Sequence, residues 1–285
     1  MEILVVGAGQ MGAGIAQVAA QHGHTVFLND RDVAFVDRGI AVIRKNLDRA
    51  YEKDRITQVE RDAAIGLIRA LPQLVFVDAD LAIEAATEDL SVKRAIFEAL
   101  DAQMPDRTIL ASNTSSISIT TLGAATKRAD RIIGMHFMNP VPVMELVEII
   151  RGLETSQKTF DTVRDLAVSL GKTPVEVHDF PGFISNRVLI PMINEAIFAF
   201  YEGVGTPDAI DTIMKLGMRH PMGPLELADF IGLDTCLAIM DVLYEGFGDS
   251  KYRPCPLLRQ YVAAGRLGRK SGRGFYDYAA PQTPA

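Results

Sequence analysis

The chain has 285 residues, 48% of them hydrophobic and 23% charged, and its 29 Lys and Arg against 36 Asp and Glu give a formal net charge of −7. This length is typical of two domains, and the apolar content excludes a wholly disordered protein. The acidic balance argues against binding to nucleic acid or to a membrane surface. It does not exclude an anionic small ligand, which a local group of cations is able to hold.

Cysteine usage and hydropathy narrow the protein class further. Cys236 and Cys255 form no CxxC motif and no cluster with histidine, so neither a zinc site nor a disulfide framework is expected. Apolar stretches such as residues 188–192 are far shorter than the roughly 20 residues that cross a bilayer. The chain opens on an apolar strand rather than on a secretory signal. We therefore expect a soluble, cytoplasmic protein with reduced thiols and no bound metal.

Residues 1–180 alternate short apolar runs with segments of helical period. Strands that are apolar on both faces and separated by helices indicate a mostly parallel sheet covered on two sides, so we predict an α/β domain in residues 1–182. The predicted strands are Ile3–Val6, Thr25–Leu28, Ala82–Ala85, Ile109–Ser112, Ile132–His136, Leu146–Ile150 and Thr173–Val177. The predicted helices are Met11–His22, Val33–Tyr51, Leu90–Ala102 and Ser156–Leu170.

The pattern changes after the segment Asp179-Phe180-Pro181-Gly182. Helical stretches punctuated by Gly and Pro replace the strands from Phe183 onward. The segment Ile184–Tyr201 is apolar nearly all round, which is typical of a helix buried within a domain or between subunits. We predict an all-helical second domain in residues 183–285.

The first strand leads into GAGQMG, residues 7–12, which matches the GxGxxG fingerprint. In that fingerprint Gly7 permits the tight turn, Gly9 lets the backbone approach a pyrophosphate, and Gly12 lets helix and strand pack closely. The helix that follows offers free N–H groups to phosphates, which favours a Rossmann-type dinucleotide site. Asp30 closes the next strand and is placed to bind an adenosine ribose, which favours NAD. Arg31 beside it is compatible with a 2′-phosphate, so NADP is the alternative.

One of the five histidines stands out by its place in the chain. His136 lies at the carboxyl end of an apolar strand, and ligands of open α/β sheets bind at that edge. Glu148 lies in the apolar run 146–150, where a carboxylate needs a partner. An imidazole oriented by a buried carboxylate is a general base, and a structural histidine is the alternative. The polar segment 112–116 adds hydroxyl groups at the same edge, unless it only caps the next helix.

Six segments in chain order carry a family resemblance: GAGQMG, ASNTSS, HFMNPVPVMELVEII, DFPGFISNR, MGPLELADFIGLD and GRKSGRGFYDY. Together, from Met1 to about Tyr278, the chain resembles the L-3-hydroxyacyl-CoA dehydrogenases, whose bacterial members are often called 3-hydroxybutyryl-CoA dehydrogenases. The resemblance implies NAD-dependent oxidation of a short-chain (S)-3-hydroxyacyl-CoA to the 3-ketoacyl-CoA, and the reverse, in fatty acid metabolism. It also implies that the helical domain binds the acyl-CoA substrate and forms a homodimer through residues 188–201; burial in a monomer core is the alternative.

The resemblance further implies roles for single residues. His136 is the general base and Glu148 orients it, while Ser115 and Asn186 hold the 3-oxygen and thioester region of the substrate. Lys53 is expected to bind a CoA phosphate, although a solvated helix with i,i+4 ion pairs is the alternative there. The expected dinucleotide contacts are Gly7, Gly9, Gln10, Met11, Gly12, Asp30, Glu88, Lys93, Asn113, Ser115, Asn139 and Lys270.

Two positions depart from the family pattern. Glu145 stands where a basic residue is common, and Met138 stands where a second aromatic is common. Neither is catalytic, so we expect any effect to fall on substrate charge or chain length. Two other functions stay open: a dehydrogenase of a free hydroxy acid of the sugar-acid or carnitine type, and a non-enzymatic NAD-binding protein.

Overall fold

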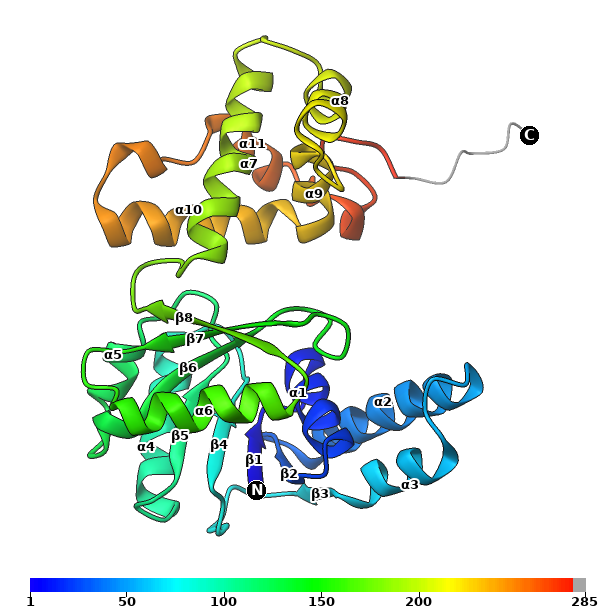
Figure 1. Cartoon of the computed structure of the whole chain (residues 1–285). Helices are drawn as coiled ribbons and strands as arrows, with labels where there is room; N and C mark the ends of the chain where they lie inside the picture. Colours follow the sequence, from blue (N-terminus) through cyan, green and yellow to red (C-terminus); the bar gives the residue numbers. More distant parts are fainter. Residues whose placement is uncertain (279–285) are drawn as a thin grey trace. The chain divides into compact units, whose positions relative to one another are not determined.

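The computed structural model describes residues 1–278, so residues 279–285 of the second expected domain lie outside the described part of the chain. The chain divides into two compact units, Met1–Phe180 and Pro181–Ala285 (Figure 1). The first unit contains a sheet with helices, and the second is built from helices. The expected fold class, an α/β domain followed by a helical domain, is confirmed.

The strands of the first unit form one sheet. They are β1 (Glu2–Val6), β2 (Thr25–Asn29), β3 (Ile68–Leu71), β4 (Leu81–Glu84), β5 (Ile109–Ser112), β6 (Ile132–Phe137), β7 (Leu146–Arg151) and β8 (Thr173–His178). Their order is β3-β2-β1-β4-β5-β6-β7-β8, and all neighbours are parallel except β6 and β7. The order reverses between β1 and β4, which is where open α/β sheets bind ligands.

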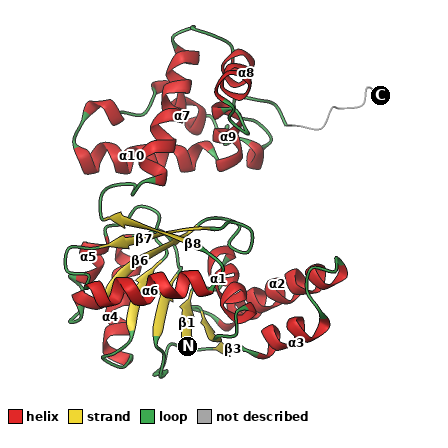
Figure 2. Ribbon diagram, in the orientation of Figure 1, coloured by secondary structure: helices red, strands yellow, loops and turns green. Residues whose placement is uncertain are grey.

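The helices of this unit pack on the sheet (Figure 2). They are α1 (Gln10–Gln21), α2 (Val33–Glu52), α3 (Gln58–Gly66), α4 (Leu90–Gln103), α5 (Ile119–Gly123) and α6 (Gln157–Ser169). Asp32, Asp89 and Ser156 each accept a hydrogen bond from a backbone N–H in the first turn of α2, α4 and α6, as N-cap residues do. Ile15 of α1 and Phe160 of α6 join the strand residues in one hydrophobic core.

The strand β3 was not predicted from the sequence, and the bounds of β4 were predicted one residue too late. The strand β3 is only four residues long and contains Arg69, and it pairs with β2 alone at the edge of the sheet. An edge strand of this length has too little apolar periodicity to be recognised. The strand predicted at Ala82–Ala85 is β4, one residue earlier, so the buried carboxylate of Glu84 ends it.

The second unit is helical throughout its described residues, apart from isolated bridges near its end. Its helices are α7 (Ser185–Tyr201), α8 (Pro207–Met218), α9 (Pro224–Ile231), α10 (Leu233–Phe247) and α11 (Pro256–Ala263). The core of this unit collects apolar side chains from four of these helices, including Ile197, Leu225, Met240 and Leu258. None of the helices in the described part of the chain is long and apolar enough to span a membrane.

Two buried carboxylates fasten the end of the described chain to this helical core. Asp229 of α9 accepts hydrogen bonds from the backbone N–H groups of Phe275 and Tyr276 at 3.0 Å. Asp211 of α8 accepts one from the Tyr276 hydroxyl at 2.8 Å. A Cβ on Gly274 would lie 1.9 Å from the Asp229 carboxylate, so only glycine fits. The bonds of Asp229 hold the segment GRGFYDY against the segment MGPLELAD.

Candidate active site

The glycine loop connects β1 to α1 at the carboxyl edge of the sheet. Gly7 has φ +107°, and a Cβ on Gly12 would lie 1.7 Å from the Gly7 carbonyl oxygen, so neither position tolerates a side chain. A Cβ on Gly9 would meet nothing within 4 Å. The loop therefore has open space in front of its middle glycine, next to the start of α1. That is the cradle that a pyrophosphate needs.

Asp30 ties this loop to the end of β2. One of its carboxylate oxygens accepts a hydrogen bond from the Ala8 N–H at 2.7 Å, and the other accepts one from the Arg31 N–H at 2.7 Å. Sequence reasoning gave Asp30 only a ribose-binding role and did not foresee that it anchors the loop. The Arg31 guanidinium lies 5.0 Å from the Phe35 ring centroid.

The predicted catalytic pair is assembled by one antiparallel strand pairing. His136 of β6 lies directly opposite Glu148 of β7 in the register. The His136 Nδ1 atom is 2.8 Å from Glu148 Oε2, and the two residues are 7% and 3% exposed. A carboxylate at this position accepts a hydrogen bond from Nδ1–H and leaves the lone pair of Nε2 to act as a base. The Ser115 hydroxyl oxygen lies 3.1 Å from Nε2.

Glu88 organises the serine loop that carries this hydroxyl. Its Oε1 atom accepts hydrogen bonds from the Thr114 hydroxyl at 2.6 Å and from the Ser115 and Ser116 N–H groups at 2.9 and 3.0 Å. The Ser116 hydroxyl also donates to it at 3.1 Å. The side chain that the resemblance assigned to the dinucleotide thus also fixes the backbone beside His136.

Lys93 is almost completely buried, at 1% exposure, in the first turns of α4. Its ammonium donates to both carboxylate oxygens of Glu84 at 2.8 Å and lies 3.5 Å from Glu88 Oε2. Glu84 was missed by the sequence reasoning. The signal was available, because an acid that ends a wholly apolar strand is the same pattern that singled out Glu148.

Two asparagines hold the ends of β5 and β6. The Asn113 side-chain oxygen accepts a hydrogen bond from the Phe137 N–H at 2.9 Å, and that of Asn139 accepts one from the Gln10 amide at 3.0 Å. The loop after Asn139 is clamped by Lys172, whose ammonium donates to two of its backbone carbonyls at 2.6 and 2.8 Å. Burial lowers the pKa of Lys172 below its ordinary value. Met11 packs against the core.

A cavity of about 570 Å³ lies next to these loops. Helix α2 lines it with Phe35, Arg38 and Asn46, and the glycine loop, α1 and residues 139–142 complete its wall. Its size is within the usual range of ligand sites. It adjoins Asn139, three residues beyond His136 in the chain.

Beyond this cavity, helix α2 and the residues just after it carry a row of cations. Lys53 is its exposed C-cap residue. Asp48 does not pair with its helix neighbours, because it forms an ion pair with Arg61 of α3 at 2.6 Å. Within the described residues, none of the cations of this row lies at ion-pair distance from a carboxylate: Arg44, Lys45, Arg49, Lys53 and Arg55.

The remaining predicted site residues belong to the second unit. Asn186 lies in the first turn of α7. The Lys270 ammonium pairs with the Asp234 carboxylate at 2.6 Å. Their expected roles toward substrate and dinucleotide stay predictions.

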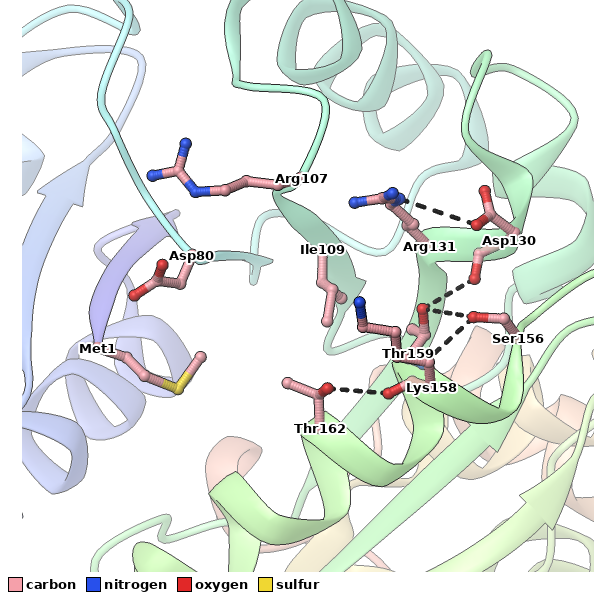
Figure 3. Close-up of a pocket in the computed structure, with 10 residues that line it drawn as sticks. All are labelled: Met1, Asp80, Arg107, Ile109, Asp130, Arg131, Ser156, Lys158, Thr159 and Thr162. Atoms are coloured by element: carbon pink, nitrogen blue, oxygen red, sulfur yellow. Dashed lines mark hydrogen bonds and ion pairs between the residues drawn. The ribbon is translucent and has the colours of Figure 1, made fainter.

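A separate cavity of about 400 Å³ opens at the opposite, amino edge of the sheet (Figure 3). Asp80 precedes β4, Ile109 begins β5 and Arg131 precedes β6, so this cavity is remote from the strand ends that carry His136. It does not belong to the site described above. Among residues 1–278, no group of three or more His, Cys, Asp or Glu side chains is arranged to hold a metal ion.

Comparison with known proteins identifies the family. Residues 2–180 match the 3-hydroxyacyl-CoA dehydrogenase NAD binding domain, and residues 182–278 match the 3-hydroxyacyl-CoA dehydrogenase C-terminal domain. A Bacillus subtilis protein named "Probable 3-hydroxybutyryl-CoA dehydrogenase" is 59% identical, over 97% of each chain. The 3-hydroxybutyryl-CoA dehydrogenase of Bradyrhizobium diazoefficiens is 58% identical, over 96% of this chain and 94% of that one.

A solved structure agrees with these sequence matches. The (S)-3-hydroxybutyryl-CoA dehydrogenase PaaH1 from Ralstonia eutropha superimposes with a TM-score of 0.96 at 51% identity, over 98% of this chain and 99% of that one. The expected Rossmann-type NAD-binding domain and the resemblance drawn from the six sequence segments are thereby confirmed. The chain belongs to the 3-hydroxyacyl-CoA dehydrogenase family.

Proposed function

We propose that this chain catalyses the NAD-dependent oxidation of (S)-3-hydroxybutyryl-CoA to acetoacetyl-CoA, and the reverse reaction. The observation that carries the proposal is the buried pair of His136 and Glu148, 2.8 Å apart at the carboxyl edge of an NAD-binding sheet. A hydroxyl group brought to Nε2 loses its proton to a base whose tautomer is already set. The family membership and the names of the similar proteins support the substrate class.

His136 moves the proton and Glu148 stabilises the charge. During oxidation Nε2 takes the proton of the 3-hydroxyl group, the C3–O bond becomes a carbonyl, and the C3 hydrogen leaves as a hydride. NAD⁺, when bound, supplies the acceptor for that hydride. The Glu148 carboxylate balances the imidazolium that forms, and Ser115 donates a hydrogen bond to the 3-oxygen. In the reverse direction the imidazolium returns its proton to the forming alkoxide.

The residues proposed to hold the dinucleotide fit the chemistry of that group. The open space before Gly9 suits a pyrophosphate, and the Asp30 carboxylate suits a ribose hydroxyl. We propose Gln10, Met11 and the second-unit residue Lys270 as further contacts, together with Glu88, Lys93, Asn113, Ser115 and Asn139. Asn186 is proposed to hold the thioester region of the substrate.

We propose that the CoA part of the substrate follows α2. The cavity beside Asn139 would take the arm that leads from the reacting carbon, and the cation row at the end of α2 would take the phosphates. From Asn46 at the cavity to Lys53 is seven residues, about 10 Å along a helix. The Lys53→Glu variant should raise the KM for acetoacetyl-CoA at least ~10-fold more than the KM for NADH, because a charged hydrogen bond is lost and a repulsion is gained. The matched control is Lys158→Glu on α6, because Lys158 lines the separate cavity at the amino edge of the sheet. Equal effects of the two variants on the KM for acetoacetyl-CoA would contradict this placement of the CoA phosphates.

We further propose a cytoplasmic homodimer that serves fatty acid metabolism. Val188 of α7 is 66% exposed, and Ile213 and Leu216 of α8 are 61% and 80% exposed. Apolar side chains exposed on two helices favour burial against a second copy of the chain. Light scattering should then give twice the 31.1 kDa of one chain. A monomer mass at micromolar concentration would contradict the dimer.

The test of the reaction is the initial rate of NADH oxidation at 340 nm with acetoacetyl-CoA, run beside free acetoacetate. We expect turnover only with the CoA ester; turnover of the free acid at a comparable kcat/KM would favour the hydroxy-acid alternative. A series of 3-ketoacyl-CoA substrates from C4 to C16 should show the highest kcat/KM at C4. Replacing NADH by NADPH should lower kcat/KM at least ~10-fold, because the Asp30 carboxylate repels a 2′-phosphate.

A further inference from the structure

Glu84 lies at the centre of a fully buried polar group at the carboxyl end of β4. Its exposure is 0%, and its two carboxylate oxygens accept four hydrogen bonds from three donor groups. The Ala86 N–H donates at 2.6 Å, the Ser112 hydroxyl at 2.6 Å, and the Lys93 ammonium to both oxygens at 2.8 Å. Every oxygen of this carboxylate is therefore satisfied, and the lysine is held in one place.

Fold stability does not explain why a lysine occupies this position. Lys93 is the fourth residue of α4, where the positive end of the helix dipole disfavours a cation. Burying an ion pair costs solvation free energy that the pair does not always recover, and apolar residues of similar volume often serve the fold equally well. Because the Lys93 ammonium is buried near the start of a helix and at the ligand-binding edge of the sheet, it indicates a role in the active site.

The lysine stands between two carboxylates that have different tasks. Glu84 contacts it closely, whereas Glu88 Oε2 is 3.5 Å away. The other oxygen of Glu88 holds the N–H groups of Ser115 and Ser116. Because Glu84 already neutralises the ammonium, Glu88 is left to orient the loop whose Ser115 hydroxyl is 3.1 Å from the base, His136.

We propose that Glu84 is a positioning residue that acts on the general base through Lys93, Glu88 and Ser115. The inference rests on the proposed function and deepens it. When an uncharged residue replaces Glu84, Glu88 becomes the carboxylate nearest to the buried Lys93 ammonium and is drawn toward it. The hydrogen bonds to the serine loop then weaken, and both the Ser115 hydroxyl and the dinucleotide contacts of Glu88 shift.

A double-mutant cycle tests this coupling: wild type, Glu84→Gln, Lys93→Met and the double variant. In the wild-type background, Glu84→Gln should lower kcat for acetoacetyl-CoA reduction at least ~10-fold and raise the dissociation constant of NADH at least ~5-fold. In the Lys93→Met background no stranded cation is left, so the same substitution should change neither quantity more than ~2-fold. Equal effects in both backgrounds, or no effect of Glu84→Gln in the wild-type background, would overturn the proposal.

A matched control separates positioning from lost stability. Asp101 and Arg128 form a second, partly buried ion pair, at 2.7 Å, and Asp101 lies on the same helix α4. Asp101→Asn should lower Tm, as Glu84→Gln should, yet leave kcat and NADH affinity within ~2-fold of wild type well below Tm. Equal losses of kcat in Asp101→Asn would show that destabilisation alone accounts for the effect of Glu84→Gln.

Two further arms keep the test decisive. If Glu84→Gln does not fold, Glu84→Asp shortens the side chain and weakens its contact with the Lys93 ammonium. This variant should raise the NADH dissociation constant about 3-fold in the wild-type background but not in Lys93→Met; equal values in both backgrounds would refute the coupling. NADH affinity, read by fluorescence, needs no acyl-CoA. A wild type that binds NADH but does not reduce acetoacetyl-CoA would therefore count against the proposed function, while the cycle in NADH affinity would still decide the role of Glu84.

Discussion

Replacing Glu148 by glutamine removes one buried negative charge and keeps the shape of the side chain. Glu148 is 3% exposed and its Oε2 atom is 2.8 Å from His136 Nδ1. A hydrogen bond to a charged group contributes roughly 1.5–3 kcal/mol. Unit charges about 4 Å apart interact by about 4 kcal/mol at an effective dielectric constant of about 20. The variant should therefore lose about 3 kcal/mol of transition-state stabilisation, which is roughly a 10²-fold lower kcat.

Steady-state oxidation of (S)-3-hydroxybutyryl-CoA measures this loss, and NADH fluorescence titration measures cofactor affinity. Affinity should stay within ~2-fold of wild type, because Glu148 contacts the base and lies on β7. Glu176→Gln is the matched control, since Glu176 is an exposed carboxylate on the adjacent strand β8, paired with Arg151 at 3.1 Å. A kcat within ~3-fold of wild type in Glu148→Gln, or an equal loss in Glu176→Gln, would show that the Glu148 charge does not support the base.

Packing determines the expected behaviour of two glycines, one buried asparagine and one buried cysteine. Gly9→Ala should keep Tm within ~2 °C of wild type, because its Cβ has open space, yet raise the NADH dissociation constant at least ~10-fold. Gly12→Ala should lower Tm strongly, because its Cβ would overlap the Gly7 carbonyl oxygen. A lower Tm in Gly9→Ala than in Gly12→Ala would contradict both predictions. Asn194→Ala should cost about 1–3 kcal/mol of unfolding free energy in denaturant titration with kcat unchanged, since it breaks buried hydrogen bonds of 3.0 and 2.8 Å. Burial raises the pKa of the Cys236 thiol to about 12, so thiol reagents at pH 8 should modify it only after unfolding.

The sequence predicts this fold well where one strand or one helix carries its own signal. Apolar runs located seven of the strands to within about a residue, and the GxGxxG hexapeptide located the turn that Gly7 and Gly12 make obligatory. His136 and Glu148 were predicted to form a pair because a carboxylate in an apolar run needs a polar partner, and an imidazole at the end of a strand is able to provide one. The antiparallel register that places them opposite each other is a property of the folded sheet.

Contacts between distant segments could not be predicted in this way. Glu84 had a signal of its own, but nothing in the sequence tells that Glu88 binds the N–H groups of a loop 27 and 28 residues away. The clamp of Lys172 on the loop after Asn139 spans 28 and 31 residues in the same manner. Such side chains look like surface charges until the sheet order brings their strands together.

We propose that His136 acts as the general base at the carboxyl edge of this sheet. The most direct test compares wild type and His136→Ala in the reduction of acetoacetyl-CoA by NADH, with NADH affinity measured in parallel. We predict a kcat lower by about 10²–10⁴-fold, the usual contribution of a positioned acid–base group, with NADH affinity within ~2-fold of wild type. Turnover of the variant within a few-fold of wild type would contradict the account.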